Sequence, residues 1–413
     1  MEKVNMQPVP AHPLELLAPA GDPERLQAAL LYGADAVYLA GDSYGMRAGA
    51  GNFNRQQLAQ AVADAHRQGV KVYVTCNTMP RCGELAELPS YLSYLQSIGV
   101  DALIVADLGV LQLARQHAPQ VALHVSTQFG VVNYATANAL YQLGASRVVL
   151  ARELSLQEIA DIRQNTPPQL ELEAFVHGAM CMSVSGRCLL SQYLTGRDAN
   201  RGACAQPCRW QYRLVEETRP DQYFPVGQDE SGSYILNAND LCMIEHLDAL
   251  IRAGVTSLKI EGRAKAVYYV AAVTNAYRCA LDAYLQEPQH YQCPSWLRQE
   301  VQNVSHRPYS TGFYMGDIPG QHLDDGLYIR QSDVVAVVQK YRSGRLYATL
   351  KNRLHRGEEV ELLLPGRPPQ KFVVDDLRGE DGQIIDQAVH PQMLFSLPAP
   401  AAPAGCMLRR CKA

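Results

Sequence analysis

The sequence predicts an α/β fold: a TIM-type (β/α)8 barrel with a cysteine-rich insertion after its seventh strand, followed by a small C-terminal β-barrel or sandwich domain. Short apolar runs alternate with helix-like stretches, the pattern of βαβ units around a parallel sheet. The seventh and eighth runs start roughly 85 residues apart, while the earlier ones start roughly 20 to 35 apart. Beyond residue 330 the helical periodicity gives way to alternating strands.

Eight apolar runs can be counted, and a closed parallel barrel of this type has eight strands. Glycine-containing turns of the kind that end a helix precede several of them, as at Gly33, Gly69, Gly99, Gly144 and Gly254. We expect an N-terminal arm over residues 1–13 and a catalytic domain over residues 14–325. The expected strands are Leu14–Pro19, Ala36–Ala40, Lys71–Cys76, Ala102–Ala106, Ala122–Ser126, Arg147–Ala151, Glu171–Val176 and Ser257–Ile260.

The insertion, at about residues 177–235, begins where the seventh strand ends, and active sites of such barrels lie at that face. Polar side chains also follow the ends of the other strands, so we expect them to converge on one rim. Any single one of them could instead cap a helix or close a turn. These residues are Asn77, Asp107, Gln128, Glu153, His177, Glu261 and Arg263.

The last segment, residues 330–413, reads as the small β domain. Four strands with turns between them are expected, and the segment shows little helical periodicity. Its basic stretch from Arg342 to Arg356 permits contact with RNA. The expected strands are Val334–Val338, Leu346–Leu350, Glu359–Leu363 and Phe372–Val374.

Composition indicates a compact globular protein, because 47% of the 413 residues are hydrophobic and 19% are charged. The longest apolar stretch, Ala102 to Leu113, is interrupted by Asp107 and is shorter than the ~20 residues of a membrane span. The amino terminus has no apolar core of a secretory signal. We therefore expect a soluble, cytoplasmic protein whose eleven cysteines are reduced or bound to metal.

The net charge of −4 gives no global sign of a polyanionic partner, since nucleic-acid-binding proteins usually show a basic face. The insertion, in contrast, has a local excess of positive charge. Between Cys181 and Arg213 it holds five arginines against one acid, Asp198. This can be a solvated loop surface or a rim that contacts phosphates. The five are Arg187, Arg197, Arg201, Arg209 and Arg213.

Four cysteines in the insertion, Cys181, Cys188, Cys204 and Cys208, lie within 28 residues in the pattern C-x6-C-x15-C-x3-C. Four thiolates suffice to ligate one iron–sulfur cluster or one metal ion. The spacing lacks the C-x2-C pairs common in structural zinc sites, which favours iron–sulfur over zinc. A third possibility is that the four cysteines are inert thiols with no ligand. A fourth is nucleophilic catalysis by Cys181 with His177 as its base.

The segment from Glu173 to Ser191, EAFVHGAMCMSVSGRCLLS, resembles the signature of the collagenase-like peptidase family, number thirty-two among peptidases of unassigned mechanism. Three further blocks are similar to the same family, so the resemblance covers most of the barrel. They are LELLAPAGDPERLQAALLYGADAVYLAG from Leu14, ARELSLQEI from Ala151 and SLKIEGR from Ser257.

Within that family, the block around Arg47, the RGACAQPCRW stretch from Arg201 and the β-rich tail are most similar to members that hydroxylate tRNA. The resemblance implies a prephenate-dependent, oxygen-independent route to 5-hydroxyuridine at the tRNA wobble position, with a 4Fe-4S cluster. Carried over to this sequence, the cluster cysteines are Cys181, Cys188, Cys204 and Cys208. A collagenase-like peptidase, a hydroxylase of rRNA or of ubiquinone precursors, and an RNA-binding protein with a structural metal remain alternatives.

The candidate roles follow from side-chain chemistry. Arg187, Arg201 and Arg209 would contact phosphates of the anticodon loop, whose unstacked bases are the easiest to extrude. Arg47 and Arg263 would bind the dicarboxylate prephenate, because guanidinium groups fit carboxylates in pairs of hydrogen bonds. His177 would transfer a proton, with Glu261 as a second acid or base.

Overall fold

The computed structural model describes residues 12–46, 51–180, 190–197, 203–207, 214–216, 219–224, 227–229, 232–234, 239–316 and 329–412. The chain divides into two compact units. The first comprises Met1–Leu26, Ala34–Ala264 and Arg307–Tyr328, and the second comprises Gln27–Gly33, Lys265–His306 and Ile329–Ala413. Among the described helices, none is both long and apolar enough to span a lipid bilayer.

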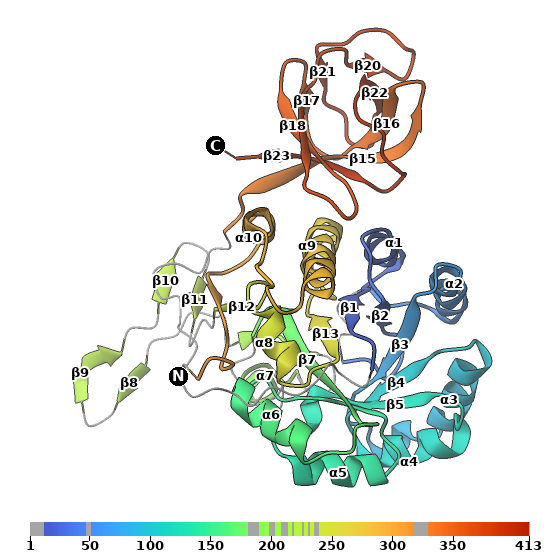
Figure 1. Ribbon diagram of the computed structural model, residues 1–413, viewed down its shortest axis with the longest axis vertical. Helices are drawn as coiled ribbons and strands as arrows, with labels where there is room; N and C mark the ends of the chain where they lie inside the picture. The colour runs from blue at the N-terminus through green and yellow to red at the C-terminus, as the bar shows by residue number, and fades with distance from the viewer. Residues whose placement is uncertain are drawn as a thin grey trace. The chain divides into compact units, whose positions relative to one another are not determined.

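The first unit is a closed barrel of eight parallel strands, as the sequence predicts (Figure 1). Each strand pairs with the next along the chain, and β13 pairs with both β1 and β7 and closes the ring. The strands are β1 (Glu15–Pro19), β2 (Ala36–Leu39), β3 (Lys71–Cys76), β4 (Ala102–Val105), β5 (Ala122–Val125), β6 (Arg147–Val149), β7 (Glu171–Gly178) and β13 (Ser257–Ile260).

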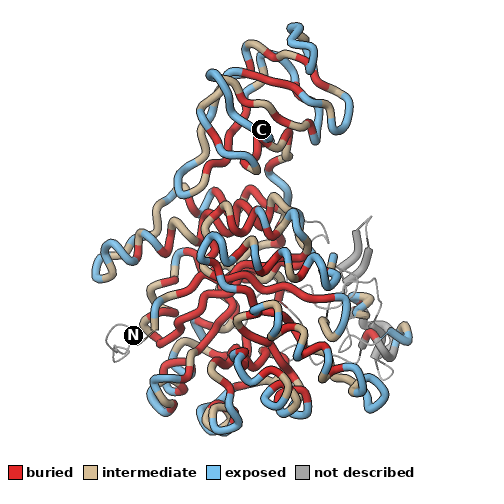
Figure 2. Tube along the Cα trace, turned by 90° about the vertical axis from the view of Figure 1, so that its right-hand side faces the viewer, coloured by how far each residue is buried: buried red, intermediate tan, exposed pale blue. Residues whose placement is uncertain are grey.

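The barrel strands are buried on both faces, which explains why their sequences are nearly continuous apolar runs. All five residues of β1 and all four of β2 are buried. In the other barrel strands only the first residue of β3, β5 and β7 is not buried, and Figure 2 shows long buried segments inside the first unit. Inward-pointing side chains fill the ring and leave it a packed core. One cluster inside it comprises Leu17, Ala36, Tyr38, Tyr73, Ala102 and Ile104.

Helices follow the strands, and several of them begin at polar capping residues. Asn54 and Ser155 form capping boxes at the starts of α2 and α6, and Asp107 caps α4 through the amide of Val110. Asp107, expected on the polar rim, is therefore a helix cap. The helices are α1 (Pro23–Leu31), α2 (Arg55–His66), α3 (Leu88–Ser97), α4 (Leu108–His117), α5 (Tyr134–Gln142), α6 (Leu156–Gln164), α7 (Leu190–Thr195), α8 (Leu247–Arg252), α9 (Val267–Gln286) and α10 (Ser295–Gln302), with 3-10 turns η1 (Cys82–Glu84) and η2 (Thr127–Phe129).

The excursion between β7 and β13 contains two antiparallel hairpins and then returns to the barrel through a short strand, β12. The residue pairs Gly178–Leu241 and His177–Cys242 join β12 to the end of β7. The insertion therefore leaves and re-enters the barrel beside His177. The strands are β8 (Leu214–Glu216), β9 (Arg219–Phe224), β10 (Gly227–Asp229), β11 (Gly232–Tyr234), β12 (Asp240–Cys242) and β14 (Tyr309–Ser310), which pairs with β12.

The second unit contains an antiparallel sheet of seven strands in the order β19-β18-β23-β15-β16-β22-β20, which confirms the predicted β domain. One face of this sheet packs a core around Leu346, Leu362 and Phe395. The strands are β15 (Ser332–Arg342), β16 (Arg345–Leu350), β17 (Leu354–His355), β18 (Glu359–Leu363), β19 (Gln370–Val373), β20 (Arg378–Gly379), β21 (Gln387–Ala388), β22 (Leu394–Pro398) and β23 (Met407–Cys411).

Candidate active site at the carboxyl ends of the barrel strands

His177 lies at the end of β7 and is 1% exposed. Its Nε2 atom is 3.4 Å from the hydroxyl of Tyr309, and the two rings lie 5.2 Å apart. The register between β7 and β13 shifts here, so that His177 stands opposite Ile260. An extra residue in one strand re-aims the side chains beyond it, and such irregularities are common next to active sites.

Glu261 follows β13 directly and is joined to His177, because its backbone amide donates to the His177 carbonyl oxygen at 2.8 Å. The hydroxyl of Tyr38, from β2, lies 3.2 Å from the Glu261 carboxylate and 3.0 Å from the carbonyl oxygen of Ile260. The structure thus brings together two residues that the sequence predicts as an acid–base pair. An imidazole and a half-buried carboxylate in this arrangement can accept and donate protons.

Arg263 is buried at the same end of the barrel, with 3% of its surface exposed. Its guanidinium donates to the Thr75 hydroxyl at 3.3 Å and to the Asn52 amide oxygen at 2.8 Å. These contacts fix the planar donor group before any substrate arrives. A guanidinium held in this way suits a carboxylate ligand.

The chain on both sides of Arg47 is attached to this rim, although Arg47 itself lies outside the described residues. On one side, the amide of Met46 donates to the Asn77 side chain at 3.2 Å. On the other side, Asn52 binds Arg263. Asn77 in turn donates to Gln128 at 2.7 Å, so two of the polar residues expected to converge do so.

Cys204 is the only one of the four proposed cluster cysteines among the described residues. Its thiol is exposed, and its sulfur accepts a hydrogen bond from the Gln206 amide at 3.4 Å. Hydrogen bonds to sulfur are a normal feature of cysteines that ligate clusters. The other cluster cysteines and the phosphate-binding candidates lie outside the described residues: Cys181, Cys188, Cys208, Arg187, Arg201 and Arg209.

Arg152 is a site residue that the sequence reasoning missed, although it stands in the ARELSLQEI block. It is 8% exposed and follows β6. Its guanidinium lies 4.9 Å from the Phe175 ring centroid and donates to the carbonyl oxygen of Ala179 at 2.9 Å. Arg152 thereby holds the chain at the start of the cysteine-rich insertion.

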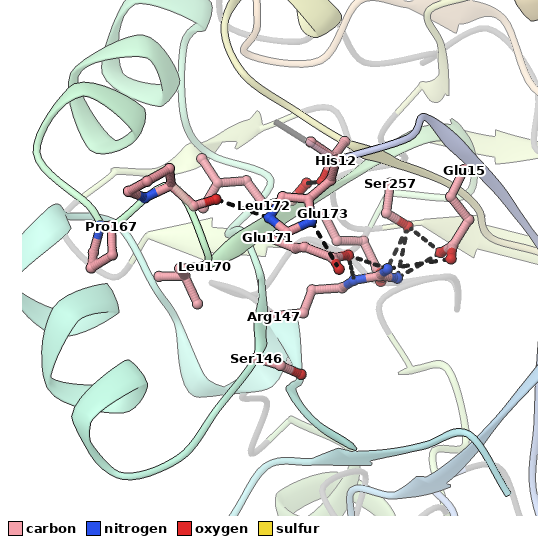
Figure 3. Close-up of polar contacts among 12 residues, drawn as sticks. His12, Glu15, Ser146, Arg147, Pro167, Leu170, Glu171, Leu172, Glu173 and Ser257 are labelled. Atoms are coloured by element: carbon pink, nitrogen blue, oxygen red, sulfur yellow. Dashed lines mark hydrogen bonds and ion pairs between the residues drawn. The ribbon is translucent and has the colours of Figure 1, made fainter. Parts of the chain in front are cut away.

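Below the rim, the barrel interior holds a buried ionic layer, drawn in Figure 3. Arg147 donates to Glu15 at 2.6 Å, to Glu173 at 3.1 Å and to the Ser257 hydroxyl at 3.1 Å, and it also pairs with Glu171. Burial alone would raise the pKa of Glu15. The positive charge of Arg147 and its hydrogen bonds outweigh burial and hold that pKa below its ordinary value.

Lys259 connects this ionic layer with the rim. Its ammonium is 2.6 Å from Glu173 and lies 4.7 Å from the Tyr38 ring centroid and 5.4 Å from that of Phe175. Tyr38 in turn contacts Glu261. Inward alternation along the strands could have identified Lys259 and Tyr38 in the sequence, because both occupy the interior face of their strands.

Comparison with known proteins agrees with this architecture. The chain is 36% identical over 403 residues to tRNA hydroxylation protein P1 of Bacillus subtilis, covering 95% of this chain and 94% of the relative. It is 35% identical over 430 residues to tRNA hydroxylation protein P of Escherichia coli, covering 94% of each. It is 42% identical over 279 residues to the 23S rRNA 5-hydroxycytidine C2501 synthase of Escherichia coli, covering 68% of this chain and 41% of that protein.

Two family descriptions account for nearly the whole sequence. Residues 21–324 match Peptidase family U32, and residues 330–409 match the Peptidase family U32 C-terminal domain. The first match contains the seven barrel strands after β1 and the insertion, and the second contains the antiparallel sheet. The chain therefore belongs to peptidase family U32.

Proposed function

We propose that this protein is an RNA-modifying enzyme that hydroxylates the wobble uridine of tRNA to 5-hydroxyuridine, in a prephenate-dependent, oxygen-independent reaction that uses a 4Fe-4S cluster. One observation carries the proposal: two relatives named as tRNA hydroxylation proteins align with the chain across both the barrel and the β domain. On this proposal the protein works in the cytoplasm, where its tRNA substrate is.

Hydroxylation of rRNA is the second candidate, because the chain is 42% identical over 279 residues to the 23S rRNA synthase. The alignment covers only 41% of that relative's length, whereas it covers 94% of each of the two tRNA hydroxylation proteins. Shared architecture over the full length favours the tRNA substrate.

The anticodon loop suits the proposed reaction, because its bases are accessible to an enzyme. A pyrimidine must leave its stack before its C5 atom can reach catalytic groups, and a base in a single-stranded loop costs least to extrude. The insertion begins and ends beside His177. Its arginines Arg187, Arg201 and Arg209 would contact phosphates while the base approaches His177 and Glu261.

Prephenate carries two carboxylates, and the proposal assigns them to Arg263 and Arg47. The assignment of one carboxylate to Arg263 is supported by its buried guanidinium, which hydrogen bonds to Thr75 and Asn52 hold in place. The hydrogen bond between Arg263 and Asn52 supports the assignment of the second carboxylate to Arg47, because Asn52 lies at this rim and only five residues beyond Arg47 in the sequence. Each guanidinium can bind a carboxylate through two parallel hydrogen bonds.

The cluster would be held by Cys181, Cys188, Cys204 and Cys208. The exposed Cys204 sulfur, with its backbone N–H partner, is a fitting ligand. When bound, a cluster supplies electron-transfer or Lewis-acid chemistry. The chain's own residues would bind the co-substrate at Arg263, transfer protons at His177 and Glu261, and hold the start of the insertion through Arg152.

The proposal can be tested on protein purified without oxygen. The expected protein is brown, contains about four irons with matching sulfide, and converts uridine to 5-hydroxyuridine in unmodified tRNA only when prephenate is present. A Cys204→Ser variant should lose iron and activity together, whereas Cys279→Ser, at a half-buried cysteine of α9, should retain both. Full iron content without uridine hydroxylation would contradict the proposed substrate. Hydrolysis of a protein substrate by iron-free protein would favour a peptidase.

A further inference from the structure

The C-terminal part of the second unit has a net positive charge, although the whole chain is negative. Residues 329–412 contain 13 lysines and arginines against nine aspartates and glutamates, a net charge of +4, while the whole chain has −4. The remainder of the protein is therefore acidic. A basic domain on an acidic enzyme indicates a dedicated contact with a polyanion.

Four of these cations lie on one face of the sheet, which we call the β16 face. Along β16, the buried residues Leu346, Ala348 and Leu350 alternate with the partly exposed residues Arg345, Tyr347 and Thr349, which therefore point away from the core. Strand pairing places Lys340 opposite Tyr347 and Arg342 opposite Arg345. Tyr347 and Arg378 both stand opposite Ser396 of β22.

These pairings create two cross-strand rows. One row runs Lys340–Tyr347–Ser396–Arg378 and the other runs Arg342–Arg345–Pro398. Since adjacent strands lie about 4.8 Å apart, Lys340 and Arg378 are separated by about 14 Å at the backbone. The face thus presents four cations from β15, β16 and β20, three of four neighbouring strands, a layout suited to successive phosphates of a nucleic-acid backbone.

Three of these cations have defined partners that keep them in place without cancelling the charge. Arg345 donates to the Asp376 carboxylate at 2.6 Å and to the Asp376 and Ser396 carbonyl oxygens. Arg378 donates to the same carboxylate at 2.9 Å. The Lys340 ammonium lies 5.1 Å from the Tyr347 ring centroid. One carboxylate, Asp376, is shared by two arginines. The four cations of the face and Asp376 therefore have a net charge of +3.

We infer that the β16 face binds the phosphate backbone of RNA and forms a contact with the tRNA substrate in addition to the contacts made by the reaction centre. The inference rests on the proposed function for the identity of the RNA. The contact is independent of sequence, because phosphates carry no base information. Its role is to raise the affinity for tRNA and leave the chemical step unchanged.

The test measures binding of the full-length protein to unmodified tRNA at several salt concentrations. The variant Lys340→Gln/Arg342→Gln removes two charges from the β16 face. The control Lys371→Gln/Lys412→Gln removes two charges from exposed lysines of the same unit that pair with acidic residues. We expect the first variant to bind about tenfold more weakly and to lower the slope of log K against log salt by about 1.5. The control should bind within about twofold of wild type.

Two outcomes overturn the inference: unchanged binding of Lys340→Gln/Arg342→Gln, or equal weakening by both double variants. Equal thermal midpoints of the three proteins confirm that folding is intact. The result is separate from the test of the reaction. A wild-type enzyme that hydroxylates tRNA while the first variant binds normally contradicts the β16 face alone. A protein that binds RNA through this face and never forms 5-hydroxyuridine contradicts the proposed function alone.

Discussion

Arg147 lies at the amino-terminal end of the barrel and neutralises carboxylates from two other strands. Its side chain is 3% exposed, and Glu15 and Glu173 are 9% and 0% exposed. The close acidic partners raise the pKa of Arg147 far above its ordinary value even though burial opposes this, so it is always charged. A polar layer of this kind must be fully satisfied, because a lone buried charge costs several kcal/mol.

Replacing Arg147 tests this dependence. Arg147→Met fills a similar volume but leaves Glu15 buried without its cation, while Glu173 keeps Lys259. We expect a loss of about 3–5 kcal/mol in stability. The control Glu171→Gln removes a partner that is 26% exposed and should cost less than about 1 kcal/mol. Denaturant unfolding followed by circular dichroism measures both. Equal losses in the two variants would contradict the central position of Arg147.

His124 makes the barrel sensitive to acid. Its ring is 4% exposed and lies edge-on to Tyr73 at 4.7 Å. Burial, together with the charges of Arg147, Lys259 and Lys71, lowers its pKa well below 6.5. The folded state therefore binds this proton less readily than the unfolded state, and the stability that neutral His124 provides above about pH 6.5 falls as the pH drops below that value.

The variant His124→Phe keeps a ring against Tyr73 and removes the titration. Between pH 7 and pH 5 the wild type should lose up to about 2 kcal/mol more stability than the variant, since one proton contributes about 1.4 kcal/mol per pH unit. Thermal midpoints at the two pH values measure this difference. Parallel pH profiles of the two proteins would show that His124 does not titrate on unfolding.

At the scale of elements, the turns before the barrel strands depend on glycine. All five glycines predicted at these turns have positive φ, as at Gly254 (+101°) and Gly69 (+74°). A Cβ atom at Gly254 would lie 2.3 Å from Cγ of Arg163, and that side chain is held by the carbonyl oxygens of Leu170 and Thr166. Nothing lies within 4 Å of a Cβ at Gly69.

These two glycines form a matched pair for a prediction. Gly69→Ala suffers only the backbone strain of a left-handed alanine, about 1 kcal/mol. Gly254→Ala suffers the same strain and also displaces Arg163, so we expect a total loss of about 2–4 kcal/mol. Differential scanning calorimetry of the two variants distinguishes them. Equal shifts in melting temperature would mean that Arg163 moves away at no cost.

The barrel was predictable from the sequence because its strands are apolar runs with glycine turns between them. The strands β12 and β14 were not, since three and two residues are too few to show a period. For the candidate site, the positions of His177 and Glu261 at strand ends could be predicted because each stands next to an apolar run. Alternation could have placed Tyr38 and Lys259 in the barrel interior. Their contacts, like those of Arg152, could not be predicted, because they join segments that are distant in sequence.

At the scale of the whole molecule, the helices α9 and α10 fall into one compact unit with the C-terminal sheet. Arg409 of β23, 1% exposed, joins them: it binds Glu300 of α10 at 2.6 and 2.7 Å and Glu361 of β18 at 2.7 Å. Burial raises the pKa of Glu300 despite Arg409, whereas the pKa of Glu361 is lowered because Arg409 outweighs its burial. The ion pair therefore couples a helix to the sheet.

Removing the Arg409 ion pairs should destabilise helix α10 and strand β18 together. Arg409→Leu leaves Glu300 buried without its cation and should cost about 3–5 kcal/mol, with faster hydrogen exchange in α10 and in β18 alike. Glu361→Gln keeps the paired hydrogen bonds to Glu300 and should cost less than about 1.5 kcal/mol. Hydrogen exchange followed by mass spectrometry resolves the two elements. Faster exchange confined to β18 would contradict a single cooperative unit.

The most direct test of the account is the 5-hydroxyuridine content of tRNA from cells that lack this gene, measured by mass spectrometry of digested nucleosides. We predict that the modification disappears from the wobble position, returns with the wild-type gene and does not return with Glu261→Gln. Unchanged 5-hydroxyuridine in the deletion strain, or loss of 5-hydroxycytidine from 23S rRNA in its place, would contradict a tRNA-hydroxylating site at the carboxyl ends of the barrel strands.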